Sequence, residues 1–156
     1  MTEEQVTRTL LNWLESNSWK IISYDFPQSG TGVVLHPNRE FRTTKNKGSF
    51  IPDIVAYKSP IVVFFENKDR FVLDDFEKVD NLRSTKNYSG SIEKHLEGID
   101  YKKIYYGTGL GYSVRNEINV DLHLEKTDFV IFCMNESLVK IKYDPNNIFL
   151  GSTLTF

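Results

Sequence analysis

Apolar residues at the start of the chain recur with the period of an α-helix. They predict a helix over residues 2–16 that buries one face. That face carries Val6, Leu10, Trp13 and Leu14. Thr2 with Gln5 matches the capping box that begins many helices. Residues 19–26 then follow a strand-like pattern with one slip, and the turn-forming residues from Pro27 onward end this strand.

The stretch over residues 51–68 predicts two short strands joined by a tight turn. The second strand holds five consecutive apolar residues before Glu66, which suits a strand covered on both faces in the middle of a sheet. Because side chains alternate along a strand, Glu66 and Lys68 point to one face and Asn67 to the other. Antiparallel pairing of the two strands can bring Asp53 beside Glu66. The pattern therefore predicts two carboxylates and one ammonium group at the rim of a hydrophobic sheet.

The remaining pattern predicts a second helix and more strands. Asp74 is the expected N-cap of a helix that runs to about Asn87. Residues 113–123 are ambiguous. Further elements are expected as a brief strand over 33–35, a short helix over 91–97, strands over 102–110 and 128–134, and an edge strand over 138–143. This order predicts a single α/β domain over residues 1–156, with a central mixed sheet flanked by helices.

Composition and charge narrow the classes of function. A chain of 156 residues with 40% hydrophobic residues can bury a substantial core. The net charge of −2 gives no general affinity for polyanions, so a nucleic-acid partner must be met by local basic patches and bound metal. The single cysteine, Cys133, lies in an apolar run and is expected to be a buried structural thiol. With no signal-peptide pattern and no membrane-spanning apolar run, the expected location is the cytoplasm.

The order of the charged residues in the central stretch resembles the PD-(D/E)XK nuclease superfamily. The matching residues are Pro52-Asp53 and, 13 residues after Asp53, Glu66-Asn67-Lys68. The resemblance covers roughly residues 2–110 and implies a restriction-endonuclease-like αβββαβ core. The stretch is also similar to archaeal Holliday-junction resolvases, which share the Pro-Asp-Ile strand, the Glu-x-Lys strand and a Ser-Gly loop like Ser29-Gly30. The chain departs from those resolvases in lacking a basic N-terminal segment and in its longer, aromatic-rich C-terminal half.

Phosphodiester hydrolysis supplies a chemical reason for these residues. Mg²⁺ binds through one or two carboxylates, keeps several waters and takes a phosphate oxygen, and Mn²⁺ can substitute. Asp53 and Glu66 fit that ligand set, and the backbone carbonyl of Asn67 is a candidate third ligand. Lys68 is expected either to hold or deprotonate the attacking water, or to neutralise charge on the phosphate.

Other residues are candidates to complete the site or to contact DNA. The resemblance implies a glutamate from the first helix, for which Glu3 is the first choice by wheel position and Glu4 the second. Gln28 and Ser29 follow the first strand and are candidate DNA contacts. A polar loop over residues 36–49 is either solvated or a phosphate-contacting arm, and its cations are Arg39, Arg42, Lys45 and Lys47. The same two alternatives hold for the cations of the second helix, Lys78, Arg83 and Lys86.

These observations together predict a metal-dependent DNA endonuclease, most similar to type II restriction endonucleases. Cleavage of a duplex needs two sites and this chain supplies one, so a homodimer acting on double-stranded or branched DNA is expected. One alternative is a structure-specific nuclease of junction-resolvase or repair type. Another is a catalytically silent nucleic-acid-binding module. Three scattered histidines have no metal-ligand spacing, so they do not favour a zinc site.

Overall fold

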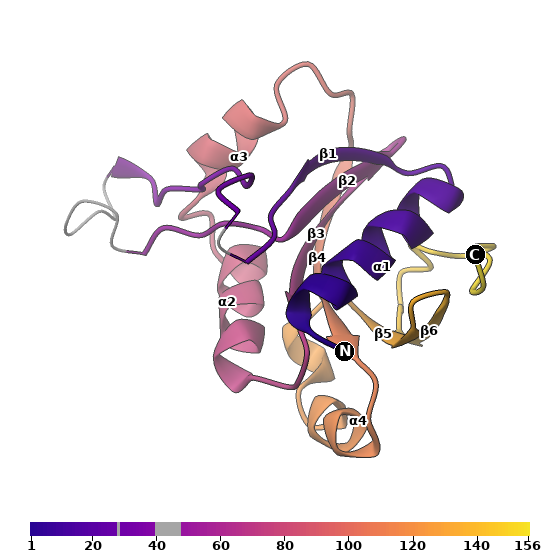
Figure 1. Ribbon diagram of the computed structural model, residues 1–156. Helices are drawn as coiled ribbons and strands as arrows, with labels where there is room; N and C mark the ends of the chain where they lie inside the picture. Colours follow the sequence, from indigo (N-terminus) through magenta and orange to yellow (C-terminus); the bar gives the residue numbers. More distant parts are fainter. Residues whose placement is uncertain (28, 40–47) are drawn as a thin grey trace.

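A single six-stranded sheet forms the centre of the molecule (Figure 1). The computed structural model describes residues 1–27, 29–39 and 48–156. Strands that are consecutive in sequence are neighbours in the sheet; β3–β4 and β4–β5 are parallel pairs and the other pairs are antiparallel. The strands are β1 (Lys20–Tyr24), β2 (Ile54–Lys58), β3 (Ile61–Lys68), β4 (Lys103–Gly111), β5 (Phe129–Asn135) and β6 (Leu138–Tyr143).

Helices cover both faces of this sheet (Figure 1). On one face lies α1 (Glu3–Ser16), which packs its apolar side on Val63 and Phe65 of β3. On the other face lie α2 (Leu73–Ser84) and α3 (Ser89–His95), which pack against Val62 and Phe64. Alternate residues of β3 thus enter two separate cores, as its unbroken apolar run predicted. The expected mixed sheet flanked by helices, in αβββαβ order with α3 inserted before β4, is confirmed.

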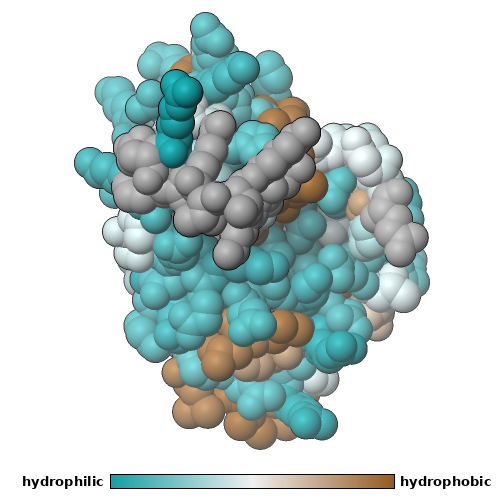
Figure 2. Space-filling view, turned by 90° about the vertical axis from the view of Figure 1, so that its left-hand side faces the viewer, coloured by the Kyte–Doolittle hydropathy of each residue, from teal (hydrophilic) through white to brown (hydrophobic). Residues whose placement is uncertain are grey.

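The ambiguous segment over residues 113–123 forms a helix at one end of the sheet. This helix, α4 (Val114–Asp121), begins just after β4, and the short 3-10 helix η2 (Leu124–Lys126) follows it. Ser113 accepts a hydrogen bond from the backbone N–H of Asn116 and so caps the start of α4 (3.0 Å). Figure 2 shows apolar side chains gathered at the lower end of the molecule, the end at which Figure 1 places α4.

Two predicted elements, the second helix and the strand over residues 33–35, differ from the structure. The N-cap of α2 is Val72, not Asp74, and Asp74 lies in the first turn, where its charge complements the helix dipole. The helix ends at Ser84 rather than near Asn87, because the backbone of Thr85 is extended (φ −115°, ψ 162°) and leaves the helical path. The expected strand over residues 33–35 is reduced to one antiparallel bridge, between Leu35 and Phe50.

Candidate active site

The antiparallel pairing of β2 with β3 places the two predicted carboxylates together. Ile54 lies opposite Phe65, and the N–H of Asp53 donates to the carbonyl of Phe65 (3.0 Å), so Asp53 stands next to Glu66 across the strand pair. Both side chains are on the face of the sheet that α2 covers. Asp53 is only 9% exposed and Glu66 7%. The short turn between the strands fixes this register, which is why sequence alone could anticipate it.

Burial makes the charged forms of these carboxyl groups costly. Burial raises the pKa of Asp53 to about 7, although a hydrogen bond from the backbone N–H of Asn67 (2.6 Å) opposes the shift. Burial also raises the pKa of Glu66 well above its ordinary value, and the charges of Asp53 and Asp75 add to the effect. Glu66 Oε2 is buried and has no hydrogen-bond partner within the described residues. A cation beside the pair would relieve both costs.

Lys68 and Glu3 meet at the end of the sheet, although 65 positions separate them in sequence. Lys68 Nζ donates to Glu3 Oε2 at 3.0 Å, and both side chains are less than one-third exposed. Burial alone would lower the pKa of Lys68, but the hydrogen bond to Glu3 and the charges of Asp75 and Glu66 outweigh burial and raise it. In this arrangement Lys68 is an ammonium ion, which favours charge neutralisation over proton abstraction. Glu4 instead pairs with Arg8 on the exposed side of α1 (2.9 Å).

Asn67 makes contacts through both its side chain and its backbone. Its side chain points toward α1, where Nδ2 donates to Thr7 Oγ1 at 3.1 Å. Its backbone N–H holds Asp53 Oδ2 in place. Asn67 is fully buried, so these contacts fix the geometry of the strand between Glu66 and Lys68. The opposite orientation of Asn67 and Glu66 agrees with strand alternation, while the metal contact of its carbonyl oxygen stays a prediction.

Asp75 is a buried acid near the site that the sequence analysis missed. It is 5% exposed, its Oδ1 accepts a hydrogen bond from Lys78 (3.3 Å), and its Oδ2 has no partner in the part of the chain that the structure describes. Glu66 lines a cavity of about 240 Å³ together with Lys78. A usable signal existed: Asp75 falls on the inward side of α2 together with Phe76 and Val79, where a charge is unusual.

The predicted DNA contacts are only partly within the described residues. Gln28, Arg42, Lys45 and Lys47 lie outside them. Ser29 is exposed in the turn after β1, where its hydroxyl donates to the carbonyl of Phe26 (2.8 Å). Asp25 begins this turn, and its N–H donates to the carbonyl of Asp53 (2.9 Å). The turn that carries Ser29 is therefore attached directly to the chain at the candidate site.

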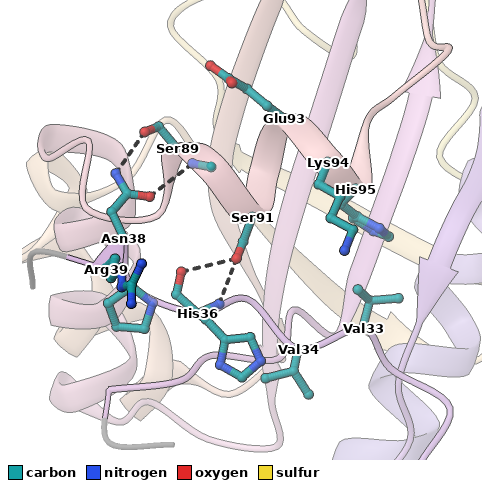
Figure 3. A pocket seen from close by; sticks show the side chains of 12 residues that line it. Val33, Val34, His36, Asn38, Arg39, Ser89, Ser91, Glu93, Lys94 and His95 are labelled. Carbon is teal, nitrogen blue, oxygen red and sulfur yellow. Dashed lines mark hydrogen bonds between the residues drawn. The ribbon is translucent and has the colours of Figure 1, made fainter. Parts of the chain in front are cut away.

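Arg39 lines a different pocket, of about 870 Å³, between the 33–39 segment and α3 (Figure 3). Lys94 and two of the three histidines, His36 and His95, line it as well. The backbone of His36 is bound to Ser91 of α3 by hydrogen bonds in both directions, through its N–H (3.0 Å) and its carbonyl (3.1 Å). The start of the polar loop is thus a packed part of the α3 side of the molecule, and Arg39 is not among the contacts that form the carboxylate pair.

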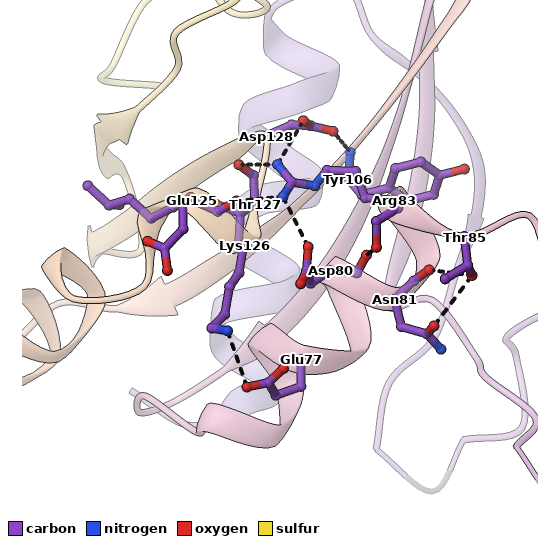
Figure 4. A network of polar contacts seen from close by, with 12 residues as sticks. Glu77, Asp80, Asn81, Arg83, Thr85, Tyr106, Glu125, Lys126, Thr127 and Asp128 are labelled. Carbon is purple, nitrogen blue, oxygen red and sulfur yellow. Dashed lines mark hydrogen bonds and ion pairs between the residues drawn. The ribbon is translucent and has the colours of Figure 1, made fainter.

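Arg83, a candidate phosphate contact, instead binds other residues of the same chain (Figure 4). Its guanidinium pairs with Asp80 (3.0 Å) and with Asp128 (3.5 Å). It also donates to the backbone carbonyl of Thr127 (3.1 Å) and to that of Glu125. These bonds tie α2 to the chain entering β5. Neither alternative for Arg83, a phosphate contact or a solvated side chain, agrees with this clamp.

The described residues lack a cluster of metal-binding side chains and a membrane-spanning helix. Within residues 1–27, 29–39 and 48–156, no three Asp, Glu, His or Cys side chains are grouped so that they could hold a metal ion. None of the helices in this part of the chain has the length and apolar character needed to cross a membrane. Comparisons of the chain with protein-family models, with curated proteins and with solved structures found no match.

Proposed function

We propose that this chain is a Mg²⁺-dependent DNA endonuclease of the PD-(D/E)XK type, similar in kind to a type II restriction endonuclease. One observation carries the proposal: the buried carboxylates of Asp53 and Glu66 stand side by side, and Glu66 Oε2 has no hydrogen-bond partner within the described residues. Such a pair costs stability unless a cation or a proton is bound. A site for a divalent cation explains why both are kept at the rim of the sheet.

The chain's own residues have distinct roles in this proposal. Asp53 and Glu66 hold the ion, with the carbonyl of Asn67 as the third protein ligand and Mn²⁺ as an acceptable substitute. The bound ion supplies a Lewis acid for the phosphate and an acidified water. Lys68 neutralises the negative charge that grows on the phosphate. Glu3 positions the ammonium of Lys68 through their 3.0 Å hydrogen bond.

The substrate in this proposal is double-stranded or branched DNA. The bound cation reverses the sign of a pocket that is otherwise acidic, so that a polyanion can approach despite the net charge of −2. Ser29 belongs to the turn that is joined to Asp53 through Asp25. Ser29 and its neighbour in sequence, Gln28, are proposed DNA contacts. The basic residues Arg39, Arg42, Lys45 and Lys47, of which only Arg39 lies within the described residues, are the proposed phosphate contacts. A homodimer supplies the second site that a duplex cut requires.

Cleavage assays test the proposal directly. The protein is incubated with supercoiled plasmid, with a four-way junction and with single-stranded DNA, in Mg²⁺, Mn²⁺ or EDTA. Discrete plasmid fragments formed only with metal support the restriction-type reading. Cleavage of the junction alone supports the structure-specific alternative, and DNA binding without cleavage supports the silent module. Absence of both metal-dependent cleavage and DNA binding refutes all three.

A matched pair of variants assigns the activity to the site. Glu66→Gln keeps the shape of the side chain but removes a proposed ligand charge, so we expect cleavage to fall at least about 100-fold. Glu136→Gln makes the same chemical change at an exposed position and is expected to retain full activity. Equal activity of the two variants would remove Glu66 from the mechanism. Mg²⁺ should raise the melting temperature of the wild type and of Glu136→Gln, but not that of Glu66→Gln.

A further inference from the structure

One side of α4 presents an apolar stripe to solvent. Val114, Ile118 and Leu122 are spaced four residues apart and are 66%, 60% and 69% exposed. The opposite side of the helix is buried through Asn116 and Val120. Figure 1 places α4 at the lower end of the molecule, the end at which Figure 2 shows apolar side chains gathered. A stripe of this spacing on a short helix is typical of a surface that packs against another protein.

The stripe stands at the same end of the sheet as the candidate active site. In the parallel pairing of β3 with β4, Lys68 lies opposite Leu110, and α4 begins shortly after Leu110. Asn116 ties the helix to the chain that leaves Lys68: its Oδ1 accepts from the N–H of Phe71 (3.1 Å), and its Nδ2 donates to the carbonyl of Asp69 (3.3 Å). The buried side of α4 is therefore attached to the segment just beyond the site.

More apolar surface adjoins the two ends of this helix. Tyr112, immediately before the cap of α4, is 37% exposed. Beyond the other end, the ring of His123 stacks on that of Phe71, with 5.4 Å between the ring centroids. Leu73, two residues after Phe71, is 42% exposed. Stable protein dimers bury about 800 Å² on each partner, so a contact centred on α4 needs such flanking residues.

We propose that α4 packs against α4 of a second copy of this chain, antiparallel and about a twofold axis at Ile118. The stripe is symmetric about that residue, so Ile118 meets Ile118 of the second copy and Val114 meets its Leu122. The same register places Arg115 opposite Asp121 of the second copy, twice. Such an isologous contact is the commonest way in which identical chains associate.

The charges beside the stripe favour a second copy of this chain as the partner. They also favour an antiparallel arrangement of the two helices. Arg115 is exposed and makes no ion pair or hydrogen bond with any described residue. Asp121 is paired with Lys142 at 2.9 Å, but its side chain is 49% exposed and can accept a second cation. Glu117 is neutralised by Lys140 and Lys142 (2.8 and 3.0 Å), so it adds little repulsion. A parallel pairing would instead set Arg115 against Arg115.

Mass measurement of the full chain tests the dimer without any assumption about function. Sedimentation and light scattering should give twice 18.1 kDa for the wild type. Ile118→Glu should give a monomer with an unchanged circular dichroism spectrum. Leu150→Glu places the same charge at another highly exposed apolar position, 80% exposed, and should remain dimeric. A wild type that is monomeric at all concentrations, or an Ile118→Glu variant that stays dimeric, overturns the proposal.

A charge exchange tests the register. Arg115→Glu should raise the dissociation constant of the dimer about tenfold or more, because like charges then meet at both symmetric positions. Combining it with Asp121→Lys restores opposite charges across the axis and should recover most of the affinity. No recovery in a double variant that retains the wild-type fold refutes the antiparallel register.

The consequence for DNA rests on the proposed function, whereas the dimer does not. With two sites at the ends joined by α4, the wild type is expected to linearise plasmid, and Ile118→Glu to leave nicked circles. If no form cleaves DNA, the nuclease proposal fails while the mass measurement still decides the dimer. If Ile118→Glu is monomeric and linearises plasmid as well as the wild type does, the dimer stands but has no part in cutting the second strand.

Discussion

Replacing Asp53 by Asn isolates the cost of the buried carboxylate pair. Asn is the informative substitution at this position, because its side-chain oxygen can still accept the 2.6 Å hydrogen bond from Asn67 N–H. Ala would leave that buried N–H without an acceptor, which costs about 1–3 kcal/mol by itself. Asp53→Asn removes the charge but keeps this bond, so it should stabilise the metal-free protein. The same change removes a proposed metal ligand, so the variant should lose DNA cleavage.

The expected magnitude follows from the pKa of Asp53. It is about 7 in the folded protein against an ordinary value of 3.8. The folded state therefore binds this proton more tightly than the unfolded chain, so the wild type loses stability as pH rises from about 4 to 7. At about 1.4 kcal/mol for each tenfold change in acidity, the full cost well above pH 7 is at most about 4.5 kcal/mol. Asp53→Asn has no ionisable group at this position, so this free-energy cost is absent from the variant.

Urea unfolding in EDTA, followed by fluorescence of the buried Trp13 and Trp19, measures this difference. At pH 8 we expect Asp53→Asn to be more stable than the wild type by up to about 4 kcal/mol, and at pH 4 by less than about 1 kcal/mol. Asp100→Asn, at an exposed position, should show no such pH-dependent gain. An Asp53→Asn variant that is no more stable than the wild type at pH 8 would refute the reasoning about the pair.

Three other perturbations have defined outcomes. Lys68→Met should keep the Mg²⁺-induced rise in melting temperature but lose cleavage at least about 100-fold, because it removes a charge that acts on the phosphate rather than on the metal. The thiol of Cys133 is buried and its pKa is raised to about 12, so Ellman's reagent should react with it only at the rate of unfolding. Gly109→Ala should destabilise the fold by roughly 1–3 kcal/mol or more in urea unfolding, since its Cβ would meet Leu10 and Asn67.

Local pattern determined much of the architecture and the centre of the site. The capping box at Thr2 is present, and β3 is buried on both faces as its apolar run requires. Asp53 and Glu66 could be paired in advance because a hairpin with a short turn has only one register that keeps its apolar faces inward. The capping box, the apolar run and the hairpin each involve residues that are close together in sequence, so a local pattern is enough to predict them.

Contacts between distant segments were decided only by the tertiary structure. The choice of Glu3 rather than Glu4 beside Lys68 depends on how α1 is set against the end of β3. Asp75 reaches the site because α2 folds back over the sheet, and Arg83 is a clamp because β5 lies beneath that helix. The sequence by itself indicated the six strands of the sheet and which carboxylates pair, since alternation and turns act locally. Packing of helices on the sheet decided where Glu3, Asp75 and Arg83 lie, because this packing depends on the shapes of surfaces that no local pattern specifies.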